Sequence, residues 1–203
     1  MYEIDPEMTP RAQSYKDFII APMPMVSMFF TKDVTRLVRK SKKGYKSNML
    51  MCYCIGQAAQ KIPEMLYQIQ DTTMLKYDKF AIDVIVRNKK GTLSYVDIPV
   101  ADDLEEFNRL YLERTKECAE RCENLYITDA SIICTSALVK YDIDGVVNLY
   151  HKEYDHHFLS WGKFSRHWFR YKLKISMQWH HALLDGGHAC LFIEELQKQF
   201  DRL

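Results

Sequence analysis

The sequence has no long apolar run. No stretch approaches the ~20 consecutive apolar residues that a membrane-spanning helix requires. The first six residues include two acidic side chains and contain no apolar core of the kind found in a secretory signal peptide. We therefore expect a protein of the cytoplasm, neither embedded in a membrane nor secreted.

Charge blocks and metal-binding spacings are missing as well. The net charge is +1, and no long like-charged block indicates nucleic acid or an anionic membrane as a partner. The six cysteines are expected to be reduced thiols in the cytoplasm. Neither the pair Cys52 and Cys54 nor the pair Cys118 and Cys122 has a convincing zinc spacing, so we predict no metal.

The composition that remains is that of a folded chain. Hydrophobic residues make up 47% and charged residues 27% of the 203 residues. This length suits one domain with a sizeable core, so we predict a single domain over residues 1–203. The ten phenylalanines and thirteen tyrosines should lie mostly in the core, with some lining a pocket for an aromatic ligand.

Helical and strand patterns are interleaved along the chain. Helices are expected at 10–18 with Thr9 as N-cap, after Thr31 or Asp33, at 47–61, from a cap at Asp102 or Asp103 to about 124, and from 189 to 203. Strands are expected at 23–30, 80–87, 92–98, 130–138 and 172–179, and 88–91 is a hairpin signal. Residues 151–168 are interpreted as a loop or short helix, with His156 and His157 on the surface. The predicted class is α+β, a two-layer sandwich of a mixed sheet with helices on one face.

The most informative stretch is His180–His188, which reads HHALLDGGH. Polar and apolar residues alternate strictly before it, as in a half-buried strand, and apolar residues recur at helical spacing after it. The stretch is therefore a junction from strand to turn to helix. Gly186 and Gly187 are expected to permit the sharp turn, because glycine tolerates backbone angles that other residues avoid.

The strand alternation separates the two histidines of this stretch. His181 continues the apolar side of the strand, and His180 continues the polar side. A histidine there, four residues before Asp185, can be partly desolvated and held in one tautomer. With an unperturbed pKa near ~6.5 it is mostly neutral at pH 7 and can act as a general base. A lone histidine near a strand end is usually structural, but the longer string favours catalysis.

The string resembles the active-site signature of the chloramphenicol acetyltransferases, His-His-Ala-Val-Cys-Asp-Gly-Phe-His. The matching positions are His180, His181, Ala182, Asp185, Gly186 and His188. The resemblance extends from Arg11 to the final helix and is densest in the C-terminal part. It implies the fold of that family, acetyl-CoA as co-substrate, acetyl transfer to a hydroxyl of chloramphenicol, and a role in antibiotic resistance.

The resemblance also implies roles for individual residues. Ser136 matches the serine that donates to the oxyanion, and His181 would be the base that takes the hydroxyl proton. Arg11 has the position of an arginine that pairs with the motif aspartate, which implies a structural ion pair with Asp185; a solvated Arg11 is the alternative. Ser160 matches a threonine that helps to hold a water near the intermediate.

The acceptor-binding positions depart from the family pattern. We expect Phe18, Ser160 and Tyr141 to bind the acceptor. The family's Phe-Tyr pair on the first helix falls near Asp17 and Phe18 here, and the Pro-Trp pair after its serine is replaced by Val139 and Lys140. Leu184 and Gly187 replace a Cys and a Phe of the family's motif. The resemblance therefore implies that the core chemistry is kept while the acceptor pocket is altered, which puts chloramphenicol itself in doubt.

The length bears on assembly. Larger relatives place the active site between two similar halves, and this chain corresponds to one half. The acetyltransferase family forms trimers with each site at a subunit interface, so the resemblance implies a homotrimer in which Ser136 acts across the boundary. The alternatives are an acyltransferase of the same fold with another hydroxyl or amine acceptor, and an inactive ligand-binding homologue. A lipoyl-linked acyltransferase would need further segments, for which we expect no room.

Overall fold

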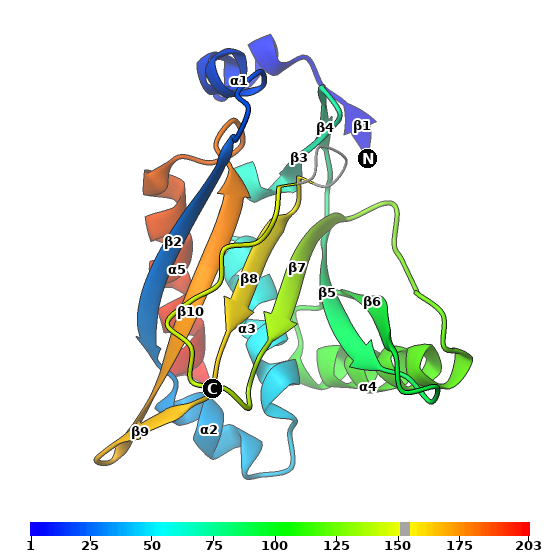
Figure 1. Ribbon diagram of the computed structural model, residues 1–203, viewed down its shortest axis with the longest axis vertical. Coiled ribbons are helices and arrows are strands. Elements are labelled where there is room, and N and C mark those ends of the chain that lie inside the picture. The colour runs from blue at the N-terminus through cyan, green and yellow to red at the C-terminus, as the bar shows by residue number, and fades with distance from the viewer. Residues whose placement is uncertain (151–154) are drawn as a thin grey trace.

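A mixed seven-stranded sheet forms the centre of the molecule in a computed structural model that describes residues 1–150 and 155–203. Its strands lie in the order β2-β10-β8-β7-β5-β6, and β9 pairs with β10 (Figure 1). Their bounds are β2 Met25–Asp33, β5 Phe80–Arg87, β6 Leu93–Pro99, β7 Ser131–Ala137, β8 His157–Trp161, β9 Ser165–His167 and β10 Arg170–His180. The pairs β5–β7 and β7–β8 are parallel, and the other pairs are antiparallel.

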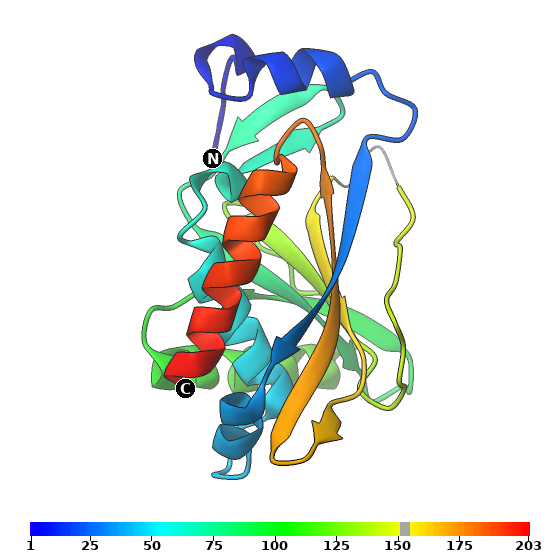
Figure 2. The same cartoon turned by 90° about the vertical axis from the view of Figure 1, so that its left-hand side faces the viewer.

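Helices cover one face of this sheet. They are α2 (Thr35–Ser41), α3 (Ser47–Ala59) and α5 (Gly186–Arg202), while α4 (Leu104–Arg121) packs along β6 and β5 (Figure 2). Strand alternation explains the arrangement, because Leu173, Ile175, Met177 and Trp179 all point towards the helices and are fully buried. Each such side chain contributes about 1.5–3 kcal/mol to folding. The predicted α+β class, with a mixed sheet and helices on one face, is confirmed.

The other face of the sheet carries no helix. Residues 139–150 cross it as an extended segment (Figure 2). Polar side chains of β10 hold this segment, since Ser176 Oγ accepts from the Val146 N–H at 3.2 Å and Gln178 Oε1 accepts from the Asn148 N–H at 2.8 Å. We call this side the open face. It exposes the large apolar side chains of Phe29, Tyr141, Val147 and Leu149.

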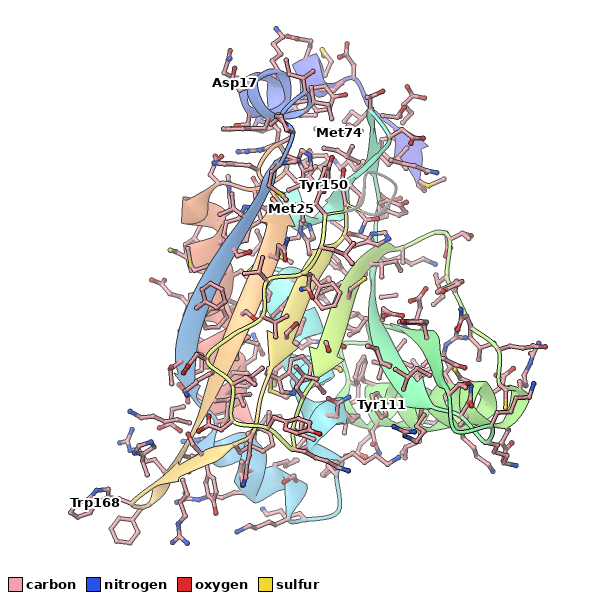
Figure 3. All side chains as sticks on the ribbon, in the orientation of Figure 1. Asp17, Met25, Met74, Tyr111, Tyr150 and Trp168 are labelled. Atoms are coloured by element: carbon pink, nitrogen blue, oxygen red, sulfur yellow. The ribbon has the colours of Figure 1, made fainter. Side chains whose placement is uncertain are left out.

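The two ends of the sheet differ. Helix α1 (Ala12–Phe18), which carries Asp17, lies at the end where Met25 begins β2 (Figure 3). The β9–β10 hairpin lies at the opposite end, with Trp168 exposed at its tip (Figure 3). Strand β10 runs towards α1, whereas β7 runs away from it (Figure 1). The residues that end β10 and β7 therefore lie at opposite ends of the sheet.

A second, three-stranded sheet was not predicted. It pairs β1 (Tyr2–Glu3), β4 (Thr73–Lys76) and β3 (Tyr67–Gln70). The short 3₁₀ helix η1 (Pro6–Met8) follows β1, and the 3₁₀ helix η2 (Pro63–Leu66) directly precedes β3. Strands of four residues or fewer give too little alternation to be recognised in a sequence.

The expectation of a loop or short helix over residues 151–168 is wrong at 157–161 and 165–167, which are strands β8 and β9. Residues 151–154 lie outside the described part, but β8 is an interior strand between β7 and β10. Its residues are largely buried on both faces, so the polar–apolar alternation that would reveal a strand is absent. His157 is fully buried and His156 is partly buried, so the surface assignment of this pair is also wrong.

Most other predicted boundaries lie close to the observed ones, and the caps explain the differences. Asp103 accepts from the Glu106 N–H at the start of α4, as predicted. Asp33 accepts from the Thr35 N–H, whereas Thr31 lies inside β2. Thr9 ends η1, and its hydroxyl accepts from the Arg11 N–H, so α1 begins later than expected. In the described part of the chain, no helix is long and apolar enough to cross a membrane.

Candidate active site

The turn between β10 and α5 is held by hydrogen bonds to the end of the strand. The N–H groups of Leu183 and Leu184 donate to the His180 carbonyl at 2.9 and 3.3 Å. The Trp179 indole N–H donates to the Leu184 carbonyl at 2.8 Å. His180 Nδ1 accepts from the Ala182 N–H at 3.1 Å. The buried end of β10 therefore fixes the path of residues 181–185.

The expected role of the two glycines is wrong. Gly186 and Gly187 are the first two residues of α5, after the turn has already been made. Neither has a positive φ, and a Cβ at either position would meet no atom within 4 Å. The turn depends on the hydrogen bonds around His180, not on glycine backbone freedom.

Arg11 ties this turn to the start of the chain. Its side chain is only 2% exposed. Two nitrogens donate to Asp185 at 2.5 and 2.7 Å, while Nε and one terminal nitrogen donate to the carbonyls of Ala182 and His181 at 3.1 and 3.0 Å. A guanidinium suits this because its donors form a rigid planar fork. The Arg11 hydrogen bonds hold the pKa of Asp185 below its usual value, so the carboxylate stays charged.

The His181 ring lies between this brace and α1. The His181 side chain is 32% exposed, and the backbone N–H of His181 donates to the Pro24 carbonyl at 2.9 Å. The ring stacks on Phe18, with centroids 4.1 Å apart and an interplanar angle of 5°. Nδ1 is buried without a hydrogen-bond partner in the described part of the chain, and Asp185 Oδ1 is 3.7 Å away. The exposed surface of the ring therefore lies away from Nδ1.

The neighbouring His180 and His157 are buried and are kept neutral by burial. His180 is 1% exposed, and its Nε2 lies 3.9 Å from Asp155 Oδ2. Burial lowers the pKa of His180 and of His157 to about 4 and raises the pKa of Asp155 to about 7. His188 caps α5, because its Nδ1 accepts from the Asp185 N–H at 3.2 Å. His180 and His188 are placed to support the turn, and the side chain of His181, at 32%, is more exposed than those of His180 and His188, at 1% and 26%.

The candidate serines lie elsewhere on the sheet. Ser136 of β7 is paired in register with Ser160 of β8, which is paired with Ser176 of β10. Residues in one row point to the same face, so all three serines lie on the open face. Ser160 is 1% exposed, and its hydroxyl has no hydrogen-bond partner among the described residues. Tyr141 lies at the same end, where its carbonyl accepts from the Lys163 N–H at 2.8 Å.

The predicted site residues therefore form two separate groups. Arg11, Phe18, His181 and Asp185 meet at the end of the sheet next to α1. Ser136, Ser160 and Tyr141 lie towards the other end. His181 follows Ser176 by five residues, which corresponds to about 16 Å along the strand, and Ser136 is two strands further across at about 4.8 Å each. Within one chain, His181 and Ser136 cannot contact the same reacting carbonyl.

Sequence reasoning missed two acidic residues on the open face. Asp83 of β5 and Asp97 of β6 are paired in register, and their exposed fractions are 7% and 2%. Both line a cavity of about 830 Å³, together with Tyr77, Tyr95, Ile132, Phe158 and Gln178. The available signal was a carboxylate inside each of two otherwise apolar strands, which costs free energy unless it is paired or functional. No group of three or more potential metal ligands occurs among the described residues.

Comparison with known proteins identifies the family of the chain. The family model described as chloramphenicol acetyltransferase matches residues 4–197. Chloramphenicol acetyltransferase 2 of Escherichia coli is 29% identical over 181 residues, which cover 84% of this chain and 83% of the relative. A chloramphenicol acetyltransferase of Clostridium perfringens is 27% identical over 193 residues, which cover 92% of each chain.

Solved structures show the same fold. A chloramphenicol acetyltransferase structure has a TM-score of 0.87 at 20% identity and covers 98% of this chain and 99% of its own. A probable dihydrolipoamide acetyltransferase of Listeria monocytogenes has a TM-score of 0.70 at 14% identity and covers 95% of this chain and 88% of its own. The matched family model, together with this fold, defines an acetyl-CoA-dependent acyltransferase. Within that class, the chain belongs to the chloramphenicol acetyltransferase family.

The Arg11 brace makes a prediction for stability. Arg11→Met removes the hydrogen-bond donor to the Asp185 carboxylate and to two turn carbonyls, so it should lower the free energy of unfolding by about 2–3 kcal/mol. The loss is smaller than for a fully buried ion pair because Asp185 is half exposed. Arg11→Lys keeps the charge but not the fork, and should lose less. Urea unfolding at one protein concentration measures both variants.

The same loss should depend on pH with a defined sign. The pKa of Asp185 is lowered in the folded state, so the ion pair contributes fully above the ordinary aspartate pKa. The difference between the parent and Arg11→Met should therefore shrink as the pH falls through the lowered pKa of Asp185. A difference that is unchanged down to strongly acidic pH would contradict a charge-dependent brace.

Proposed function

We propose that this chain transfers an acetyl group from acetyl-CoA to a hydroxyl group of a small acceptor. Chloramphenicol is the first acceptor to test, because the curated relatives bear its name. The observation that carries the proposal is the state of His181. Its ring is partly exposed and held in place by Phe18 and the Arg11 brace, whereas its buried neighbour His180 is kept neutral by burial.

In the proposed mechanism, His181 removes the hydroxyl proton of the acceptor as a general base. The acceptor oxygen then attacks the thioester carbonyl and forms an anionic tetrahedral intermediate. The Ser136 hydroxyl donates a hydrogen bond to this oxyanion, a type of contact that typically contributes ~3–4 kcal/mol. When the intermediate collapses, the C–S bond breaks and the imidazolium returns the proton to the coenzyme A thiolate.

Asp185 acts indirectly in this mechanism. Its carboxylate is occupied by two Arg11 nitrogens and lies 3.7 Å from His181 Nδ1, outside hydrogen-bond distance. It positions the turn that carries the base and adds negative charge near the imidazolium. Phe18 restricts the ring through stacking, and Ser160 offers a buried hydroxyl in the row of Ser136.

We propose further that the working site forms between two copies of the chain. One chain carries the base and the oxyanion donor too far apart, so a second copy must bring its Ser136 end to the His181 end of the first. Such a head-to-tail contact closes into a ring when the rotation allows it, and three copies give a homotrimer with three equivalent sites. The exposed apolar side chains on the open face offer a surface for this contact.

The direct experiment measures free thiol released from acetyl-CoA with and without chloramphenicol. Thiol release that depends on the acceptor, with an acetylated product of the expected mass, supports acetyl transfer. If the protein binds acceptors but releases no thiol with any hydroxyl or amine compound, the chain is an inactive ligand-binding homologue.

His181→Ala should lower turnover by at least the ~10²–10⁴-fold that a general base contributes. The matched control is His167→Ala, since His167 is an exposed histidine on β9. The control should keep normal turnover and both proteins should keep normal thermal stability. A His181→Ala protein with near-normal turnover would exclude the mechanism.

Mixed assemblies test whether the site is shared. His181→Ala and Ser136→Ala should each be nearly inactive alone. When the two variants are co-expressed with different tags and purified through both tags, each mixed cyclic trimer should contain one intact site, so roughly a third of the sites should be restored. If verified mixed assemblies stay as inactive as the two parents, the base and the oxyanion donor do not come from different copies.

A further inference from the structure

The paired carboxylates of the open face belong to no part of the mechanism above. Asp83 lies directly opposite Asp97 in the β5–β6 pairing and opposite Cys134 in the β5–β7 pairing. The same row continues through Phe158 of β8 and Gln178 of β10. Both aspartates are more than nine-tenths buried, so they cannot be treated as solvated surface charges.

These carboxylates have few partners within the chain. Asp97 Oδ2 accepts from the Ile127 N–H at 2.7 Å. The nearby Arg114 donates its Nε hydrogen to the Asp97 backbone carbonyl, at 2.6 Å. The two carboxyls also hydrogen-bond to each other, and the positive charge of Arg114 acts on Asp97. No cation in the described part of the chain is among the groups that shift the pKa of Asp83, and burying a charge without a close ion-pair partner is costly.

The pKa values of both carboxyls are raised in the folded protein. Burial, followed by the charge of Asp97, raises the pKa of Asp83 to about 7. Burial also raises the pKa of Asp97, although the Ile127 N–H and Arg114 act in the opposite direction. Because the charge of Asp97 is one cause of the raised pKa of Asp83, the pair favours a form in which one carboxyl is protonated and the other is charged.

The pair faces a cavity that suits a small ligand. Its volume is about 830 Å³, and aromatic side chains from Tyr77, Tyr95 and Phe158 contribute to its walls. Mostly apolar walls with a few convergent polar groups are typical of ligand sites. Aromatic faces beside a negative charge favour a cation, which they attract through the ring quadrupole.

The cavity also lies close to the proposed oxyanion donor. Ser136 follows Cys134 by two residues on the same face, and Asp83 is on the next strand. Strand geometry puts the backbone of Asp83 about 8 Å from that of Ser136. A second observation is independent of the acidic pair: the Ser160 hydroxyl beside Ser136 is buried without a partner among the described residues. Cys134 and Phe158 line the cavity, and Ser136 and Ser160 follow them by two residues on the same strands, so the buried hydroxyl lies at the margin of the cavity.

We propose that Asp83 and Asp97 form an acceptor subsite for a protonated amine, so that the preferred acceptor is an aromatic amino alcohol. This inference rests on the proposed function. The ammonium group would lie against the two carboxyls, and the hydroxyl, within roughly 8 Å of it, would point along the sheet towards Ser136 at the margin of the cavity. A neutral acceptor would leave the buried negative charge without a partner, and would bind less well.

The test compares two acceptors that share their hydroxyl groups. One is chloramphenicol, and the other is the primary amine that remains when its dichloroacetyl group is removed. Thiol release from acetyl-CoA at pH 7 gives kcat/KM for each, and mass spectrometry identifies whether oxygen or nitrogen is acetylated. We expect kcat/KM to be at least tenfold higher for the amine, with acetylation on oxygen. Equal values, or a preference for the neutral compound, would overturn the inference.

Substitution identifies the source of that preference. Asp83→Asn and Asp97→Asn, alone and together, keep the side-chain shape and remove the charge, and should lower the amine preference at least tenfold. Asp102→Asn is the control, because Asp102 is exposed before α4. If the Asn variants do not fold, the preference of the unaltered protein for the amine still decides the inference. A preference that survives in folded Asn variants would show that the pair is only structural.

Failure of the proposed function would look different. If neither compound causes thiol release, acetyl transfer is wrong, and calorimetry of amine and neutral compound then decides the subsite alone. Tighter binding of the amine that is lost in the Asn variants would support the subsite. Equal binding of the two compounds would overturn it.

Discussion

The guanidinium of Arg11 is the contact on which the proposed site depends. It is separated from Asp185 by 174 positions in the chain, yet it donates to that carboxylate and to two carbonyls of the turn. Arg11 is also the N-cap residue of α1, and Phe18 at the end of this helix stacks on the His181 ring. One buried cation therefore fixes both the backbone that carries the base and the aromatic ring that restricts it. Without that cation, the turn would keep its hydrogen bonds to His180 but lose its orientation relative to α1.

The alternation of the strands explains the division of labour in the sheet. One face of β10 supplies Leu173, Ile175, Met177 and Trp179 to the core, and the opposite face supplies polar side chains. Registered pairing then brings serines of three strands into one row and the aspartates of two strands into the next row. Because β10 and β7 run in opposite directions, His181 and Ser136, the proposed base and oxyanion donor, end up far apart. A half-site at each end of one sheet is the geometry that a ring of identical subunits can complete.

The sequence predicted those features that depend on local periodicity and failed for those that depend on tertiary contacts. Long alternating or helical segments such as β10, α3 and α4 were placed within a few residues, because their period is visible. Strand β8 was missed because burial on both faces removes the alternation, and His157 was misplaced with it. Gly186 and Gly187 were given a conformational role that the hydrogen bonds of His180 perform. The contact between Arg11 and Asp185 could be anticipated only through family resemblance, and the pairing of Asp83 with Asp97 not at all, since register between strands is set by the whole sheet.

The separation of the two aspartates from the catalytic motif has a consequence for specificity. The base lies on a turn at the end of β10, whereas the aspartates lie in the middle of β5 and β6. Substitutions on β5 and β6 can therefore change the charge of the cavity without moving the turn, because Arg11 holds that turn from a different part of the chain. In this proposal, chemistry that needs sub-ångström positioning is fixed by the ion pair of Arg11 with Asp185, while recognition that needs only a matching charge is carried by side chains on the sheet. On this basis, the acyl-transfer residues and the acceptor preference can vary independently within one fold.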